Sequence, residues 1–192
     1  FELGIGWGSV PTEFPTFGVG STEPRARVDR LTETLEVVQA LWSGEQVSYS
    51  GAHHSLDDAQ QSPAPEHRIP IVIGGAGPRT LGLVARFADW WNLPINKLDQ
   101  FEELREKTGD ARPSLQERVT FVPEGGDRAA IVETAMRRFS DTGHAVGNAA
   151  ELVEHYAARS AAGIERTYVW TSDFAAPDTL AEFGETVIGA LA

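Results

Sequence analysis

Cysteine is absent from the 192 residues of the chain. Its absence excludes disulfide bonds, a thiolate nucleophile and any cysteine-based metal site. A protein without thiols fits a reducing compartment, so we expect a cytoplasmic location. Long hydrophobic runs are also missing, because the most apolar stretch, residues 69–76, is far too short to span a bilayer. We therefore expect no membrane-spanning segment in this sequence.

Basic residues are scarce, with 16 lysines and arginines against 28 aspartates and glutamates, which gives a net charge of −12. Such a balance repels phosphate backbones and anionic lipid surfaces, so we expect neither nucleic acid nor membrane as a partner. The five histidines show no spacing typical of metal ligands, and we expect no metal. No G-x-S-x-G element for a nucleophilic serine occurs either.

The sequence does contain alternating strand and helix patterns, which favour a parallel α/β fold. Val28, Leu31 and Leu35 form one face of a helix expected over residues 21–44. A small hairpin follows over residues 46–56, and then comes an apolar run at 69–74 that is typical of a strand buried on both faces. The other expected elements are helices near 79–88, 98–108, 128–139 and 148–163, strands near 90–93, 118–122 and 167–170, and a helix near the C-terminus.

Counting these units predicts an incomplete TIM-barrel-like fold. Strands near residues 3, 72, 91, 120 and 168 are each associated with helices, and residues 19–65 form a helix–hairpin insertion after the first strand. The remaining stretch of about 145 residues holds roughly five units at about 30 residues each, whereas a barrel needs eight. We expect one domain over residues 1–192, a partial barrel whose open strand edges favour a homo-oligomer. Since the chain starts inside a strand-like run, we also expect a longer parent protein.

The first candidate site is the glycine-rich turn after the apolar strand, which contains Gly75, Ala76, Gly77, Pro78, Arg79 and Thr80. Glycines let backbone N–H groups approach a ligand, and a helix N-terminus adds unpaired donors and partial positive charge. These features suit a phosphate, to which Arg79 and Thr80 add a charge and a hydroxyl. The alternative is a tight strand-to-helix turn with no ligand. Gly77→Val is expected to obstruct the approach of a phosphate, whereas the same change at exposed Gly109 is expected to have little effect on cofactor binding.

The second candidate site is the segment Leu3-Gly4-Ile5-Gly6-Trp7-Gly8-Ser9. Glycine at every second position leaves one face of a strand without side chains. This pattern predicts a site where a flat ring packs against the backbone near Gly6, with Trp7 at its border. The alternative explanation is crowding at a barrel interior.

These segments resemble the luciferase-like monooxygenase family, in particular its oxidoreductases that use the deazaflavin coenzyme F-420. The resemblance extends over almost the whole chain. It is carried by residues 3–8, Glu13-Phe14, Phe17-Gly18-Val19, Leu41-Trp42-Ser43-Gly44, Val47-Ser48-Tyr49-Ser50-Gly51, residues 70–80, residues 85–92 and Ala161-Ala162-Gly163-Ile164-Glu165-Arg166.

The resemblance implies a barrel enzyme with F-420 or FMN as cofactor and a small molecule as substrate. It places the cofactor phosphate on the loop from Gly75 to Thr80 and the ring beside Gly4–Gly8. The family's first three strands have no counterpart here, and Ser9 stands where some relatives carry a glutamate, so no catalytic residue is assigned. Two other hypotheses stay open. One is a non-catalytic remnant that binds a phosphate-bearing ligand or a partner chain, and the other is an ordinary phosphate-binding barrel enzyme such as an isomerase.

Overall fold

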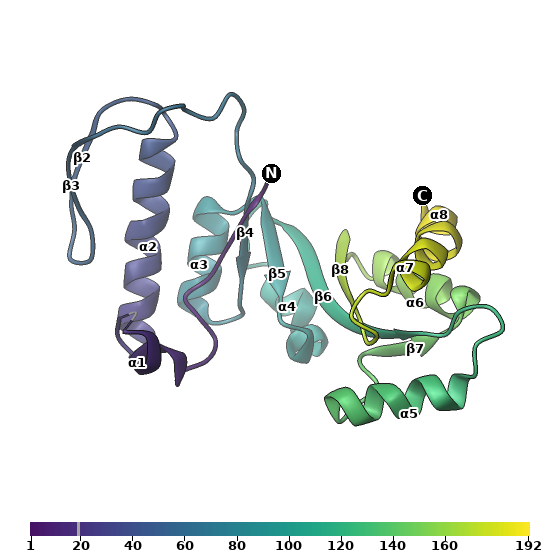
Figure 1. The fold of residues 1–192 in the computed structure, drawn as a ribbon. Coiled ribbons are helices and arrows are strands. Elements are labelled where there is room, and N and C mark those ends of the chain that lie inside the picture. The colour runs from purple at the N-terminus through teal and green to yellow at the C-terminus, as the bar shows by residue number, and fades with distance from the viewer. Residues whose placement is uncertain (19) are drawn as a thin grey trace. The chain divides into compact units, whose positions relative to one another are not determined.

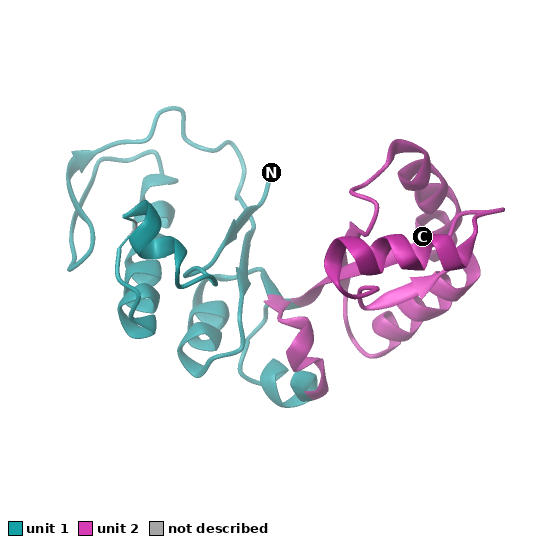
Figure 2. Cartoon of the chain, turned by 60° about the horizontal axis from the view of Figure 1, so that its bottom comes forward, with its two compact units in different colours: residues 1–91, 100–112 teal, residues 92–99, 113–192 magenta. Residues whose placement is uncertain are grey.

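The computed structural model describes residues 1–18 and 20–192; Val19, where the predicted insertion begins, lies outside the described residues. The chain divides into two compact units, which Figure 2 shows in different colours. Unit 1 comprises residues 1–91 and 100–112, and unit 2 comprises residues 92–99 and 113–192. The single domain expected over residues 1–192 stays a prediction.

The sheet of unit 1 is built around a buried strand. β1 (Leu3–Ile5) pairs in parallel with β4 (Ile71–Gly74), and Leu3 lies opposite Ile71. The three apolar residues of β4 are all buried, which confirms the strand predicted from the apolar run. α3 (Pro78–Phe87) follows it directly, and β5 (Trp90–Leu93) lies next to β4 in the sheet. The glycine-rich turn therefore joins a rigid strand to a helix.

The helix–hairpin insertion is confirmed. A short α1 (Glu13–Phe17) precedes α2 (Pro24–Leu41), and β2 (Val47–Ser50) and β3 (Ser55–Ala59) form an antiparallel hairpin beside α2 (Figure 1). One carboxylate of α2 binds the loop of this hairpin through hydrogen bonds. Glu33 accepts hydrogen bonds from the backbone N–H groups of residues 52–54 at 2.8–2.9 Å. These bonds lower the pKa of Glu33 against the opposing effect of burial.

Unit 2 is organised around one long strand. β6 (Arg112–Phe121) pairs in parallel with both β7 (Ala145–Gly147) and β8 (Arg166–Thr171). Helices α5 (Arg128–Phe139) and α6 (Ala149–Ala161) lie between these strands in the sequence. The C-terminal helix consists of α7 (Pro177–Phe183), a π-helical turn η2 (Gly184–Ile188) and α8 (Gly189–Leu191).

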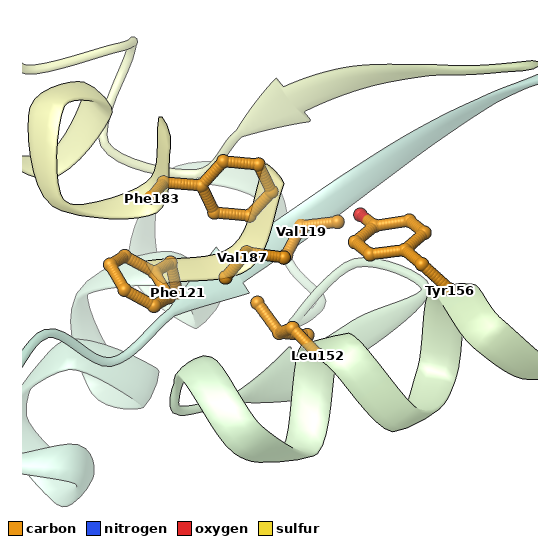
Figure 3. Close-up of a cluster of buried hydrophobic side chains, with 6 residues drawn as sticks. All are labelled: Val119, Phe121, Leu152, Tyr156, Phe183 and Val187. Atoms are coloured by element: carbon orange, nitrogen blue, oxygen red, sulfur yellow. The ribbon is translucent and has the colours of Figure 1, made fainter. Parts of the chain in front are cut away.

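The core of unit 2 joins β6, α6 and the C-terminal helix. Figure 3 shows its six side chains, which are Val119, Phe121, Leu152, Tyr156, Phe183 and Val187. The rings of Phe121 and Phe183 meet edge to face at 5.5 Å between centroids, a preferred arrangement of aromatic pairs. α6 begins with a capping box, in which Asn148 and Glu151 each accept the other's backbone N–H.

Four elements differ from the sequence expectations, and the first is the short helix α1, which was not predicted. The helix expected over 98–108 is shorter: a 3-10 turn η1 (Ile95–Gln100) leads into α4 (Phe101–Arg105), whose end tightens through bonds three residues apart. β6 starts at Arg112, well before residue 118, and the short strand β7 was not predicted. Among the described residues no helix is both long and apolar enough to cross a membrane.

Candidate functional site

The glycine-rich turn between β4 and α3 has a backbone shape that only glycine adopts easily. Gly75 has a φ of +132°, and a Cβ added to it would lie 2.9 Å from Cγ2 of Thr80. Both the dihedral angle and the close approach therefore disfavour a side chain at this position. Gly77, in contrast, has a φ of −71°, and the nearest atom to an added Cβ is Thr80 Oγ1 at 3.9 Å. Space therefore remains above Gly77.

The backbone N–H groups of this turn are open. Within residues 1–18 and 20–192, the N–H groups of Ala76, Gly77, Arg79 and Thr80 have no hydrogen-bond partner. α3 has no side-chain cap, Pro78 occupies its first turn, and its first backbone bond runs from Leu81 N to Gly77 O at 2.9 Å. An uncapped helix start of this kind presents donors and partial positive charge to an anion.

Two tryptophans hold the turn. The indole Nε1 of Trp91 donates to the carbonyl oxygen of Gly75 at 2.8 Å. Because C=O and N–H of one trans peptide point in opposite directions, this bond turns the N–H of Ala76 away from Trp91. The indole Nε1 of Trp7 donates to Oγ1 of Thr80 at 3.1 Å, and Thr80 is only 3% exposed. The structure thus brings Trp7 and Thr80, two predicted site residues, into direct contact.

Arg79 lies away from the open N–H groups. Its guanidinium pairs with Asp29 of α2 and also reaches the carbonyl oxygen of Arg25 at 3.4 Å. The side chain is about half exposed (49%). Arg79 therefore joins α3 to α2 in this structure, and its contact with a phosphate stays a prediction.

The glycine face of β1 is open. Gly4 and Gly6 are exposed, and a Cβ added to either one would meet no atom of the described residues within 4 Å. The crowding that the alternative explanation requires is therefore not provided by residues 1–18 and 20–192. Trp7 is half-buried beyond the strand, where the guanidinium of Arg27 stacks over its ring at 4.5 Å. A hollow of about 670 Å³ lies along this segment, and Gly6, Trp7, Phe14 and Arg27 are among its lining residues.

Sequence analysis missed two residues that support the turn. Trp91 lies in the strand expected near 90–93; it is fully buried, and its indole also donates to the carbonyl oxygen of Gly75. Arg27 lies beside Val28 on the buried face of α2, and only 8% of it is exposed. A cation next to an apolar helical stripe is the signal that could have identified Arg27. Among the described residues no group of three histidines, aspartates and glutamates could hold a metal ion.

A family profile and individual relatives place this chain among the same group of proteins. The profile of the luciferase-like monooxygenases matches residues 1–113. An F420-dependent glucose-6-phosphate dehydrogenase of Microbacterium testaceum is 38% identical over 87 residues, which are 45% of this chain and 26% of that protein. The chain thus spans about a quarter of the length of this relative.

Solved structures show the fold over the whole chain. An F420-dependent secondary alcohol dehydrogenase, solved with an F420-acetone adduct, matches 100% of this chain and 69% of its own with a TM-score of 0.76 at 20% identity. A riboflavin lyase, solved with modified FMN and riboflavin, matches 94% of this chain and 60% of its own with a TM-score of 0.69 at 14% identity. The predicted fold class, an incomplete TIM-barrel-like α/β fold, is confirmed.

Proposed function

Because the chain belongs to the luciferase-like monooxygenase family, we propose that it carries the cofactor-phosphate site of an oxidoreductase that uses coenzyme F-420 or FMN. The reaction is hydride transfer or monooxygenation of a small-molecule substrate. The relatives named as F420-dependent dehydrogenases support this class. When bound, the cofactor supplies the redox chemistry at its ring, and the protein supplies binding and orientation. An ordinary isomerase is set aside by the family match.

The open N–H groups of the glycine-rich turn carry this proposal. Four backbone donors at the start of α3, from Ala76, Gly77, Arg79 and Thr80, lack partners among the described residues. The N-terminus of a ten-residue helix adds its partial positive charge. The space above Gly77, which a side chain would fill, leaves room for phosphate oxygens. The residues present therefore fit a phosphate.

The open face of β1 supports a place for the flat ring. Gly4 and Gly6 present bare backbone there, and β1 lies beside β4, whose end leads into the phosphate-binding turn. We assign binding roles to Gly6, Trp7 and residues 75–80, and no catalytic role to any residue.

Cofactor titration followed by fluorescence tests the phosphate site. Four proteins are compared: the wild type, Gly77→Val, Thr80→Val and the control Gly82→Val. Thr80→Val keeps the buried shape but removes the hydroxyl. A hydrogen bond to a charged group contributes about 1.5–3 kcal/mol, so Thr80→Val weakens FMN or F-420 binding about tenfold or more. Gly77→Val weakens it further because the side chain occupies the phosphate space.

Gly82 replaces Gly109 as the control position. The small effect of Gly109→Val on cofactor binding stays a prediction, but Gly109 has a φ of +62° and an added Cβ would lie 3.3 Å from the backbone of Ala85, so a substitution there is strained. Gly82 is exposed on α3, and an added Cβ there meets no described atom within 4 Å. Equal cofactor affinity in all four proteins would show that the turn does not bind the cofactor phosphate and has a purely structural role. Binding without turnover of any substrate would favour the non-catalytic alternative.

A further inference from the structure

The contact between Trp7 and Thr80 has only one possible direction. An indole Nε1–H donates and never accepts, so Thr80 Oγ1 must be the acceptor at 3.1 Å. The hydroxyl of Thr80 therefore keeps its own proton for another partner. Within residues 1–18 and 20–192 that proton has no acceptor, although Thr80 is 97% buried, with only 3% exposed. A buried donor without an acceptor is costly to a fold.

The position of Thr80 Oγ1 shows where its proton is available. This oxygen lies 3.7 Å from the Cβ that Gly75 lacks and 3.9 Å from the Cβ that Gly77 lacks. Thr80 Oγ1 therefore borders the space beside the turn whose backbone N–H groups are open. Trp7 occupies one side of the oxygen, so the remaining direction for the O–H bond includes this space. An anionic oxygen there would satisfy the donor.

Trp7 itself packs against Arg27 of α2. The guanidinium of Arg27 lies 4.5 Å from the centroid of the Trp7 ring and 4.5 Å from that of Phe14. Arg27 is buried, and its Nη1 donates to the carbonyl oxygen of Gly8 at 3.4 Å. A guanidinium over an aromatic face is attracted to the ring, and this stabilises the stacked position of the indole. The indole therefore presents its N–H to Thr80 from a packed position.

We propose that Trp7 is a positioning residue for the phosphate site, which directs the Thr80 hydroxyl proton toward a cofactor phosphate. This inference rests on the proposed function. It assigns Trp7 to the phosphate end of the cofactor, whereas the sequence prediction placed Trp7 at the border of the ring. The two roles differ in a measurable way, because only the phosphate role depends on the phosphate group.

The test compares each cofactor with its phosphate-free form. Dissociation constants are measured for FMN and riboflavin, and in parallel for F-420 and its phosphate-free deazaflavin, with the wild type, Trp7→Phe, Thr80→Val and the double variant. Trp7→Phe keeps an aromatic ring under Arg27 but removes the N–H. Trp42→Phe, at the end of α2, is the matched control. Thermal unfolding of every variant checks that the fold is retained.

We expect Trp7→Phe to weaken binding of the phosphate-bearing cofactor about three- to tenfold, the effect of one neutral hydrogen bond. The phosphate-free form keeps its wild-type affinity, and Trp42→Phe changes neither. In the double variant, Trp7→Phe adds no loss beyond that of Thr80→Val, because the hydroxyl through which it acts is gone.

Two results would overturn the inference alone. Equal losses for the phosphate-bearing and phosphate-free forms would place Trp7 at the ring, and additive losses in the double variant would separate Trp7 from Thr80. A wild-type protein that binds FMN and F-420 no more tightly than their phosphate-free forms would instead overturn the proposed phosphate site, and the inference with it.

Discussion

Gly75 has a backbone conformation that a side chain opposes in two ways. Its φ of +132° lies in a region that other residues rarely adopt, and an added Cβ would approach Thr80 Cγ2 to 2.9 Å. Strain of this kind costs about 1–3 kcal/mol per residue. We expect Gly75→Ala to lower the free energy of unfolding by about that amount, measured by urea denaturation.

Gly77 provides the matched comparison two residues along the same turn. Its φ of −71° suits any residue, and an added Cβ makes only an ordinary contact at 3.9 Å. Gly77→Ala should therefore change the stability by less than about 1 kcal/mol, a small effect at a helix N-cap. If both variants unfolded at the same urea concentration, strain at Gly75 would not explain its glycine.

Glu117 interrupts the apolar pattern by which β6 could have been recognised in the sequence. It is a fully buried carboxylate in β6, bound by His155 Nε2 at 2.9 Å and by Arg159 Nε at 2.9 Å. Burial, and then the charge of Glu117, raise the pKa of the neighbouring Tyr156 hydroxyl. A charged residue in a strand breaks the apolar pattern, while its partners lie about 40 residues away. The first half of β6 was therefore not predicted.

At the scale of elements, Asp89 connects the starts of β4 and β5. One carboxylate oxygen accepts the backbone N–H of Ile71 at 2.8 Å, and the other pairs with Arg68. Burial alone would raise the pKa of Asp89, but the hydrogen bond and charge of Arg68 and the Ile71 N–H lower it overall. The folded state therefore holds this carboxylate in its ionised form.

The lowered pKa gives a definite pH dependence. Since the folded pKa lies below the unfolded value of about 3.9, the stabilisation is present above that value and is lost as the pH falls through the folded pKa. Asp89→Asn should lower stability at pH 7 by about 1.5–3 kcal/mol. The difference from the wild type should shrink below about pH 3.9.

Denaturant titrations at several pH values measure this difference. Asp57→Asn, at an exposed position of β3, is the control for the removal of one carboxylate charge. A wild-type-to-Asp89→Asn difference that stayed constant from pH 7 to acid would contradict the role of the ionised carboxylate.

Elements with strong local signals were predictable from the sequence, whereas elements that depend on distant partners were not. The apolar run of β4 and the Asn148–Glu151 capping box can each be recognised from a few consecutive residues of the sequence. The short strand β7 has only three residues and depends on its pairing with β6. The glycine-rich turn was visible in the sequence, but the bond from Trp7 to Thr80 joins residues 73 positions apart. Such a contact becomes visible only in the folded chain.

At the scale of the whole molecule, both units leave a strand edge open. Among the described residues β1 pairs only with β4, and β8 pairs only with β6. Unit 2 also has a hollow of about 960 Å³, and its lining residues Val169, Leu180, Ile188 and Leu191 are 37–58% exposed. Open edges and exposed apolar side chains promote pairing with further chains.

We therefore expect the isolated 192-residue chain to associate, and light scattering across a range of concentrations measures this. The net charge of −12 makes the chains repel one another at low ionic strength, so association should increase when salt screens that charge. Val169→Lys places a charge on the open strand β8, and Ile188→Glu places one on the apolar hollow; each should shift the average mass toward that of one chain. Glu165→Lys, just before β8, changes the charge without covering apolar surface and tests whether net charge alone explains the shift. A mass equal to one chain at every concentration and salt level would show that the exposed edges do not drive assembly.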